Sequence, residues 1–318
     1  MQESRAWVVG TAGRARGASA ARRPTGAQDM NTQPSRLAKL CKLIQLALAA
    51  QTHSPNTTQT DTTQNNPLLR NKLNTNTNLH TYAAIAAAAI PTPLVLVTFV
   101  GIKSVWAATL GVELSWILLP MAIMLTFPVA KTNFKNALRH ASQRHARQAA
   151  VGLALCLVTV GSFLILLVIL QATLSDEVQA RLKHIRVEAA TYGFSSSDYT
   201  MVGVFSGWFI LVNPTLEELF WRIFIFDSIS RLTCAKTREG AIGVMLATSA
   251  LYASYHSSVL FVFFDAPTAS LALLGLVGYG MFLQILTSRI GVFAAIGAHT
   301  GGDAVVLIGL WLSIRPPG

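Results

Sequence analysis

The 318 residues are 12% charged and 52% hydrophobic, whereas soluble domains carry about 25% charged residues. This composition excludes an ordinary soluble domain and indicates a polytopic membrane protein. The net charge of +11 does not predict nucleic-acid binding, because ten of the Lys and Arg residues lie within residues 1–80, ahead of the apolar part of the chain. A basic tail of this kind is typical of contact with anionic lipid or with an import receptor.

Residues 1–80 are predicted to form a basic, low-complexity N-terminal extension. Residues 1–30 are rich in Arg, Ala and Gly and poor in acids, which suits either a transit peptide or a disordered extension, and Met30 is a second candidate start. A basic amphipathic helix is predicted at 35–50, where it would lie on a membrane surface. The Asn- and Thr-rich linker that follows contains one glycosylation sequon, at Asn56.

Residues 81–318 form the predicted membrane domain, which is all-α. Seven apolar segments are long enough to cross a hydrocarbon core of about 30 Å. They lie near 83–102, 109–129, 150–171, 201–226, 241–264, 269–288 and 291–313. Lys and Arg gather in the loops after the second, fourth and sixth spans, which predicts a cytoplasmic N-terminus. A short interfacial helix is predicted within 176–199, and Gly297-x-x-x-Gly301 predicts close packing of the seventh span.

Three charges lie within the fourth predicted span: Glu217, Glu218 and Arg222. A charge at the centre of a spanning helix raises the free energy of membrane insertion by roughly 2.5–3.5 kcal/mol, so we expect these residues to have charged partners or a functional role. Glu218 and Arg222 are four residues apart and share a helix face, so they can pair. Glu217 points about 100° away and is left unpaired. A Glu–Arg pair alone would suit a purely structural contact between helices, whereas the unpaired Glu217 favours a functional role. The Asn213-Pro214 sequence predicts a break or kink in the helix just before the glutamates.

Four more ionisable side chains are predicted to lie deep in apolar helices. Glu113 is in the second span, His256 in the fifth, and His299 and Asp303 share one face of the seventh. At about 1.5 Å per residue, Glu217, His256, His299 and Asp303 all reach the middle of the hydrocarbon core. These four side chains can therefore converge.

A buried Glu with two His and an Asp supports two hydrolytic chemistries. The glutamate can take a proton from water as a general base, while the histidines hold the water or stabilise an oxyanion. Glu plus two His is also a hydrolytic zinc set, which makes zinc the candidate cofactor and Glu217, His256, His299 and Asp303 its candidate ligands. A proton- or ion-coupled transporter could use the same side chains as a relay. A seven-helix receptor is disfavoured by the predicted orientation of the N-terminus.

Three short motifs follow one another on separate predicted spans. They are Glu217-Glu218-x-x-x-Arg222, Tyr252-x-x-x-His256 and His299-x-x-x-Asp303. In this order they resemble the marks of the CAAX protease and bacteriocin-processing intramembrane proteases, which include type II CAAX prenyl endopeptidases. The resemblance covers about residues 200–313. It implies an intramembrane endopeptidase whose site is ordered by the Glu218–Arg222 pair.

The resemblance also implies roles for the remaining motif residues. Glu217 and His256 would activate the water, and His299 with residue 303 would face the oxyanion. The sequence departs from the family's pattern at two positions, with Tyr252 in place of Phe and Asp303 in place of the commoner Asn. An ionised Asp cannot donate a hydrogen bond to an oxyanion. Asp303 is therefore either protonated, or a metal ligand, or a sign of a non-catalytic relative.

The sequence thus predicts an intramembrane peptidase with membrane lipid and a protein or peptide substrate as partners, and no nucleic acid. In a eukaryotic chain the resemblance favours a prenylated CAAX C-terminus as substrate and the endoplasmic reticulum as location. An organelle membrane is the alternative if residues 1–30 are a transit peptide. The rival hypotheses are the coupled transporter and a catalytically inactive scaffold of the same fold.

Overall fold

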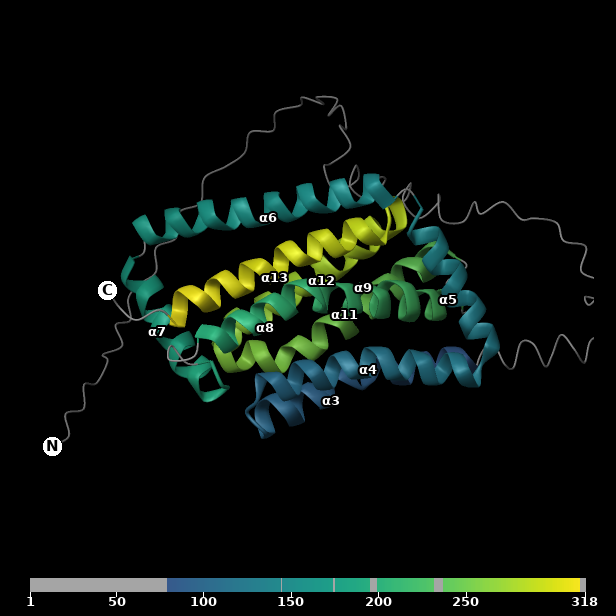
Figure 1. Ribbon diagram of the computed structural model, residues 1–318, viewed down its shortest axis with the longest axis horizontal. Helices are drawn as coiled ribbons and strands as arrows, with labels where there is room; N and C mark the ends of the chain where they lie inside the picture. Colours follow the sequence, from purple (N-terminus) through teal and green to yellow (C-terminus); the bar gives the residue numbers. More distant parts are fainter. Residues whose placement is uncertain (1–78, 144, 174, 195–198, 232–236, 315–318) are drawn as a thin grey trace, which may run out of the picture. The chain divides into compact units, whose positions relative to one another are not determined.

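The computed structural model describes residues 79–143, 145–173, 175–194, 199–231 and 237–314, and the described residues form helices and no strand (Figure 1). The predicted amphipathic helix at 35–50, the candidate transit peptide and the sequon at Asn56 lie outside these residues. The fold class predicted from composition, an all-α polytopic membrane protein, is confirmed.

Five of the described helices are long and apolar enough to cross a membrane. They are Leu79–Gly101, which comprises the helix at 79–89 with α3 (Pro91–Val95) and the π-helical η2 (Leu96–Gly101), then α4 (Val105–Thr126), α6 (His145–Thr173), α12 (Ala266–Arg289) and α13 (Val292–Ile314). These helices correspond to the first, second, third, sixth and seventh predicted spans.

The other two predicted spans are also helical, but they do not meet the same test of length and apolar composition. The fourth is divided into α8 (Tyr199–Leu211), α9 (Asn213–Glu218), the π-helical η3 (Leu219–Ile225) and α10 (Phe226–Ser230), and the fifth is α11 (Arg238–Phe263). Charged residues in the fourth and the polar Tyr252–His256 segment in the fifth lower their apolar character. The count of seven spans therefore stays a prediction.

The division of the fourth span follows from its sequence. A turn at Val212 separates α8 from α9. Pro214 is in the first turn of α9, where its missing N–H does no harm, whereas it could not continue the ladder of α8. The predicted break before the glutamates is confirmed, and it leaves Asn213 as the first residue of a new helix.

Two connecting segments are helices in their own right. The predicted helix between the third and fourth spans is α7 (Ser175–Thr191). The basic segment after the second span, interpreted from sequence as a loop, is instead the helix α5 (Pro128–Ala141). Pro128 starts this helix, and Phe134 packs against Phe224 of η3 while the Lys and Arg side chains stay exposed. The loop interpretation was wrong because apolar residues at helical spacing are interspersed among the charges.

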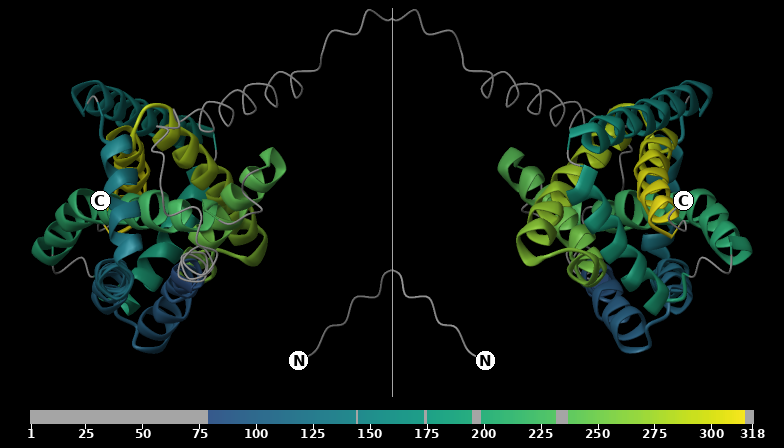
Figure 2. Two further views of the ribbon diagram at one scale, coloured as in Figure 1. Left: turned by 90° about the vertical axis from the view of Figure 1, so that its right-hand side faces the viewer. Right: turned by 90° about the vertical axis from the view of Figure 1, so that its left-hand side faces the viewer.

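Helices α6 and α13 lie side by side over most of their length (Figures 1 and 2). A Cβ atom built on Gly297 would come within 2.5 Å of the backbone of Gly152, and one on Gly301 within 2.8 Å of Cys156 Cα. The contact therefore excludes any side chain at these glycines. The predicted small-residue packing face of the last span is confirmed, with α6 as its partner.

Helix η3 is enclosed by other helices, since all of its residues from Phe220 to Ile225 are buried. The Trp221 ring stacks on Tyr255 of α11 at an interplanar angle of 3°. Trp116 of α4 also packs edge to face with Tyr255, with 5.7 Å between ring centroids. The two glutamates, which directly precede η3, are buried as well and so point into the protein interior rather than toward lipid.

Candidate active site

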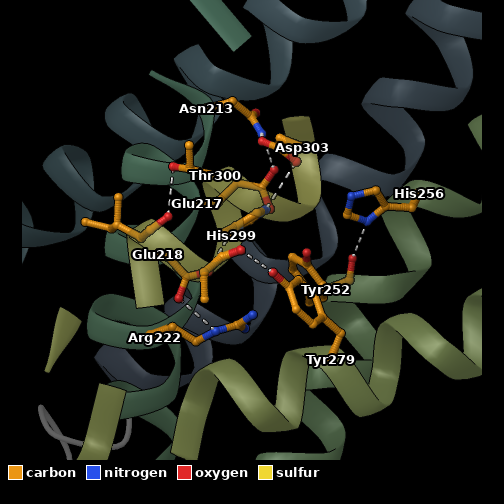
Figure 3. Close-up of polar contacts among 12 residues, drawn as sticks. Asn213, Glu217, Glu218, Arg222, Tyr252, His256, Tyr279, His299, Thr300 and Asp303 are labelled. Atoms are coloured by element: carbon orange, nitrogen blue, oxygen red, sulfur yellow. Dashed lines mark hydrogen bonds and ion pairs between the residues drawn. The ribbon is translucent and has the colours of Figure 1, made fainter. Parts of the chain in front are cut away.

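The three sequence motifs meet in one buried site (Figure 3). The junction of α9 and η3 contributes two glutamates and an arginine, α13 contributes a histidine and an aspartate, and α11 contributes Tyr252 and His256. The carboxyl groups of Glu217 and Glu218 are buried, as are His299 and Asp303. The predicted convergence of these residues is therefore observed, apart from the position of His256 described below.

Glu218 binds two basic side chains at once. Its Oε2 lies 3.2 Å from Arg222 Nε, and its Oε1 accepts a hydrogen bond of 2.9 Å from His299 Nδ1. The guanidinium of Arg222 also lies over the Tyr252 ring, 4.7 Å from its centroid, which is within the range of a cation–π interaction. The predicted Glu218–Arg222 pair is confirmed. It links α9 and η3 to α13 and α11.

Glu217 takes no part in that pairing, as its helix position predicts. Its Oε1 accepts a hydrogen bond of 2.8 Å from Asn213 Nδ2, and its Oε2 lies 3.6 Å from His299 Nε2. The Tyr255 hydroxyl is close enough to interact with the carboxylate. Neither Tyr255 Oη nor Glu217 Oε2 completes a hydrogen bond with another described residue. Asn213 thus holds one oxygen of Glu217, and the other completes no hydrogen bond with a described residue.

Asp303 also meets Asn213. Its Oδ2 accepts a hydrogen bond of 3.1 Å from Asn213 Nδ2, and its Oδ1 lies 3.7 Å from His299 Nε2. Because Nδ1 of His299 is used by Glu218, the opposite edge of the imidazole faces the free oxygens of Glu217 and Asp303. A proton on Nε2 would point to this space between the two carboxylates.

His256 lies beside this network rather than within it. Its Nδ1 donates to the Tyr252 carbonyl oxygen at 3.1 Å, and its ring packs on the Tyr255 ring with 3.9 Å between centroids. Among the described residues His256 makes no hydrogen bond or ion pair with Glu217, and Figure 3 shows it apart from Asp303. The hydrogen bond from Nδ1 leaves Nε2 as an acceptor in the neutral ring.

Residues 200–305 match the family model of Rce1-like type II CAAX prenyl endopeptidases. The match begins in α8 and ends in α13, so it contains all three motifs, and the resemblance seen in the sequence is confirmed over this segment. Comparison with curated proteins and with solved structures finds no match to the chain. The five apolar helices and the match support an integral membrane protein, and the matched segment is similar to a family of membrane proteases.

The Rce1-like segment does not hold its candidate metal ligands in a metal-binding arrangement. No group of three or more His, Cys, Asp and Glu side chains among the described residues could hold a metal ion. His256, which would complete the two-histidine set, lies apart from the others, and Asn213 occupies one oxygen on each of two carboxylates. We therefore derive no step through a metal, and zinc stays a prediction.

Two residues of the Rce1-like segment were missed as site residues in the sequence. Asn213 lies four residues before Glu217, so helix geometry places it on the same face, and that spacing was an available signal. Tyr255 precedes His256, and only the packing of α11 on η3 brings it near Glu217. Glu113, the remaining deep carboxylate, is outside the site, since its Oε2 accepts a hydrogen bond of 2.8 Å from Trp208 Nε1 of α8.

Proposed function

We propose that this chain is an intramembrane endopeptidase in which Glu217 activates the attacking water. The observation that carries the proposal is the state of the Glu217 carboxylate. It is buried, one oxygen is held by Asn213, and the other has no hydrogen-bond partner among the described residues. A fixed carboxylate with one free oxygen in a dry site is what a general base for water requires.

In the proposed reaction, Glu217 Oε2 takes a proton from a water molecule as the water oxygen attacks the peptide carbonyl carbon. The carbonyl oxygen becomes an oxyanion. His299 Nε2 lies on the free side of Glu217, and because Nδ1 already donates to Glu218, Nε2 donates to the oxyanion when the imidazole is doubly protonated. Glu217 then gives its proton to the leaving nitrogen as the C–N bond breaks. Glu218 and Arg222 make no contact with the reacting atoms in this scheme; they hold His299 in place.

Asp303 and His256 have supporting roles in the proposal. Asp303 accepts from Asn213. When Asp303 is ionised it has no proton to offer an oxyanion, and His299 then carries the donor role alone. His256 presents Nε2 as an acceptor next to the Tyr255 ring. It serves the attacking water or the substrate amide, in line with the role that the family resemblance implies.

The proposed substrate is the C-terminus of a prenylated CAAX protein, cleaved at the membrane. This finer assignment is supported by the family of the matched segment and by the burial of the site among apolar helices. A prenyl chain adds apolar surface worth about 0.8 kcal/mol per buried CH₂, which would hold such a substrate in the same bilayer. The endoplasmic reticulum is the proposed membrane.

The test is peptide hydrolysis by the purified protein in liposomes. The probe is a fluorogenic peptide that ends in a farnesylated Cys-aliphatic-aliphatic-X sequence, compared with the same peptide without the farnesyl group. We expect cleavage of the farnesylated peptide by the parent and no cleavage by Glu217→Ala. A folded parent that cleaves neither peptide would overturn the proposal in favour of an inactive scaffold or a transporter. Cleavage of both at equal rates would overturn the substrate class alone.

A further inference from the structure

Asn213 lies at the break in the fourth predicted span. It is the first residue of α9, directly after the turn at Val212, and its side chain is buried. From there it reaches both along its own helix and across to α13.

The amide nitrogen of Asn213 bridges two carboxylates that come from different helices. Nδ2 donates to Glu217 Oε1 at 2.8 Å and to Asp303 Oδ2 at 3.1 Å (Figure 3). An amide nitrogen carries two protons, and a carboxylate oxygen is an acceptor. The nitrogen end of the amide must therefore face these groups, and one proton serves each carboxylate.

This bridge decides which oxygens are left for chemistry. With Oε1 and Oδ2 bound to the amide, the remaining oxygens, Glu217 Oε2 and Asp303 Oδ1, lie 3.6 and 3.7 Å from the same atom, His299 Nε2. Without a donor between them, two buried carboxylates would repel each other and turn apart, because charge repulsion is strong where water is excluded. The amide is the described group that offsets this repulsion from the α9 side.

We propose that Asn213 is a positioning residue of this site: its amide holds the base Glu217 and the Asp303 carboxylate in fixed positions relative to each other. The inference rests on the proposed function. It explains how an Asp is accommodated at 303: the amide of Asn213 on α9 donates a hydrogen bond to the Asp303 carboxylate on α13.

The first test replaces the amide and measures kcat and KM separately on the farnesylated peptide. Asn213→Leu keeps the approximate side-chain volume and removes both N–H donors. The Glu217 and Asp303 carboxylates are then no longer held in fixed positions relative to each other. We expect kcat to fall by roughly 100-fold, the size of effect that a misplacement of about 1 Å produces, with KM changed by less than about twofold. Asn213→Ser keeps a single donor and should give an intermediate kcat. The matched control is Thr215→Ala, since the Thr215 hydroxyl donates a hydrogen bond to the Leu211 carbonyl of its own span and none to the described residues of the site.

The second test asks whether Asn213 acts through Asp303. Asn213→Asp places a third carboxylate in the site and removes the donors, so we expect it to be nearly inactive. Adding Asp303→Asn restores one amide between the helices and should raise kcat on the order of tenfold over the single variant. A merely structural role would give additive losses instead.

The outcomes separate this inference from the proposed function. If the parent cleaves and Glu217→Gln does not, but Asn213→Leu keeps the parental kcat, the positioning role is overturned alone. The positioning role is also overturned if the double variant Asn213→Asp with Asp303→Asn is no more active than Asn213→Asp alone. It is overturned as well if Asn213→Leu changes only KM and not kcat. An inactive parent overturns the proposed function and the inference with it.

Discussion

Glu218 and His299 face each other across α9 and α13, with 2.9 Å between Oε1 and Nδ1, although they are 81 residues apart in the sequence. The second oxygen of the same carboxylate lies 3.2 Å from Arg222 Nε, and the Glu218 and Arg222 side chains are almost completely buried. Glu218 therefore neutralises the charge of Arg222 inside the bundle and also orients the His299 imidazole through its hydrogen bond with Nδ1. Glu217, its neighbour in sequence, does not pair with Arg222 and does not contact Nδ1. The two glutamates should respond differently to the same substitution.

Glu218→Gln is expected to lower stability as well as activity. The substitution leaves the buried Arg222 guanidinium without its counter-charge, and breaking a buried pair in this way costs about 3–5 kcal/mol. We expect a lower yield of monodisperse protein and a lower melting temperature in detergent. Glu239→Gln on the exposed first turn of α11 is the control and should leave both unchanged. A Glu218→Gln protein as stable as the parent would show that the pair does not hold the site together.

Glu217→Gln is expected to abolish turnover and spare the fold. Gln keeps an oxygen that can accept from Asn213, so the shape of the site is retained, but it cannot take a proton from water. A loss of 10²–10⁴-fold or more in kcat is typical when a general base is removed. The melting temperature should stay within about 2 °C of the parent, since no buried cation loses its main partner. Full activity in this variant would end the hydrolase hypothesis.

Asp303→Asn separates two roles for residue 303. If this residue faces the oxyanion, Asn can still accept from Asn213 through its oxygen, and it donates at every pH because an amide has no ionised form. Activity should then be kept and should extend to higher pH than in the parent. If residue 303 ligates a metal, Asn is a poorer, neutral ligand and activity should fall. The measurement is a pH–rate profile of both proteins.

Chelation completes the Asp303 experiment. A parent that depends on zinc should lose activity to phenanthroline and regain it when zinc is added back. Chelator-sensitive parent activity together with an inactive Asn variant would reject the donor role and favour a metal site. A chelator-resistant parent with an active Asn variant is the result we expect, because the side chains in the described part of the chain form no group suited to a metal.

Gly297→Ala is expected to separate α6 from α13. The added Cβ would lie 2.5 Å from backbone atoms of Gly152, where neither helix has a flexible side chain to move aside. Overpacking of this kind costs about 1–3 kcal/mol, so the melting temperature should fall. Gly309→Ala lies on the same helix with nothing within 4 Å of its Cβ, and this control should be neutral. Equal stability of the two variants would contradict the close approach of the helices.

The orientation of the chain is testable at Asn56. The distribution of Lys and Arg predicts a cytoplasmic N-terminus, so this sequon should stay unmodified if the protein resides in the endoplasmic reticulum. The experiment is a glycosidase digest followed by gel electrophoresis, with Asn56→Gln as the reference. A band shift that is lost in the reference would reverse the predicted topology and revive the receptor hypothesis.

Some features of this protein follow from its sequence because they are local. The apolar segments, the break before Asn213, the pairing of Glu218 with Arg222 and the small-residue face at Gly297 depend on composition or on helix spacing within one segment. The three motifs also follow, since their residue types and order are visible in the chain. The basic segment at α5 was misjudged, because its charges obscured an apolar stripe at helical spacing.

The arrangement of the site was decided by the tertiary structure. Counting residues along a span places a side chain at a depth in the membrane, but it does not say toward which neighbour the side chain points. The direction depends on how each helix is rotated about its axis, and that rotation is set by packing such as the contact of α13 with α6 and of η3 with α11. For this reason His299 meets Glu218 and Asn213 bridges Glu217 and Asp303, whereas His256, at a similar depth, is turned toward Tyr252 and Tyr255.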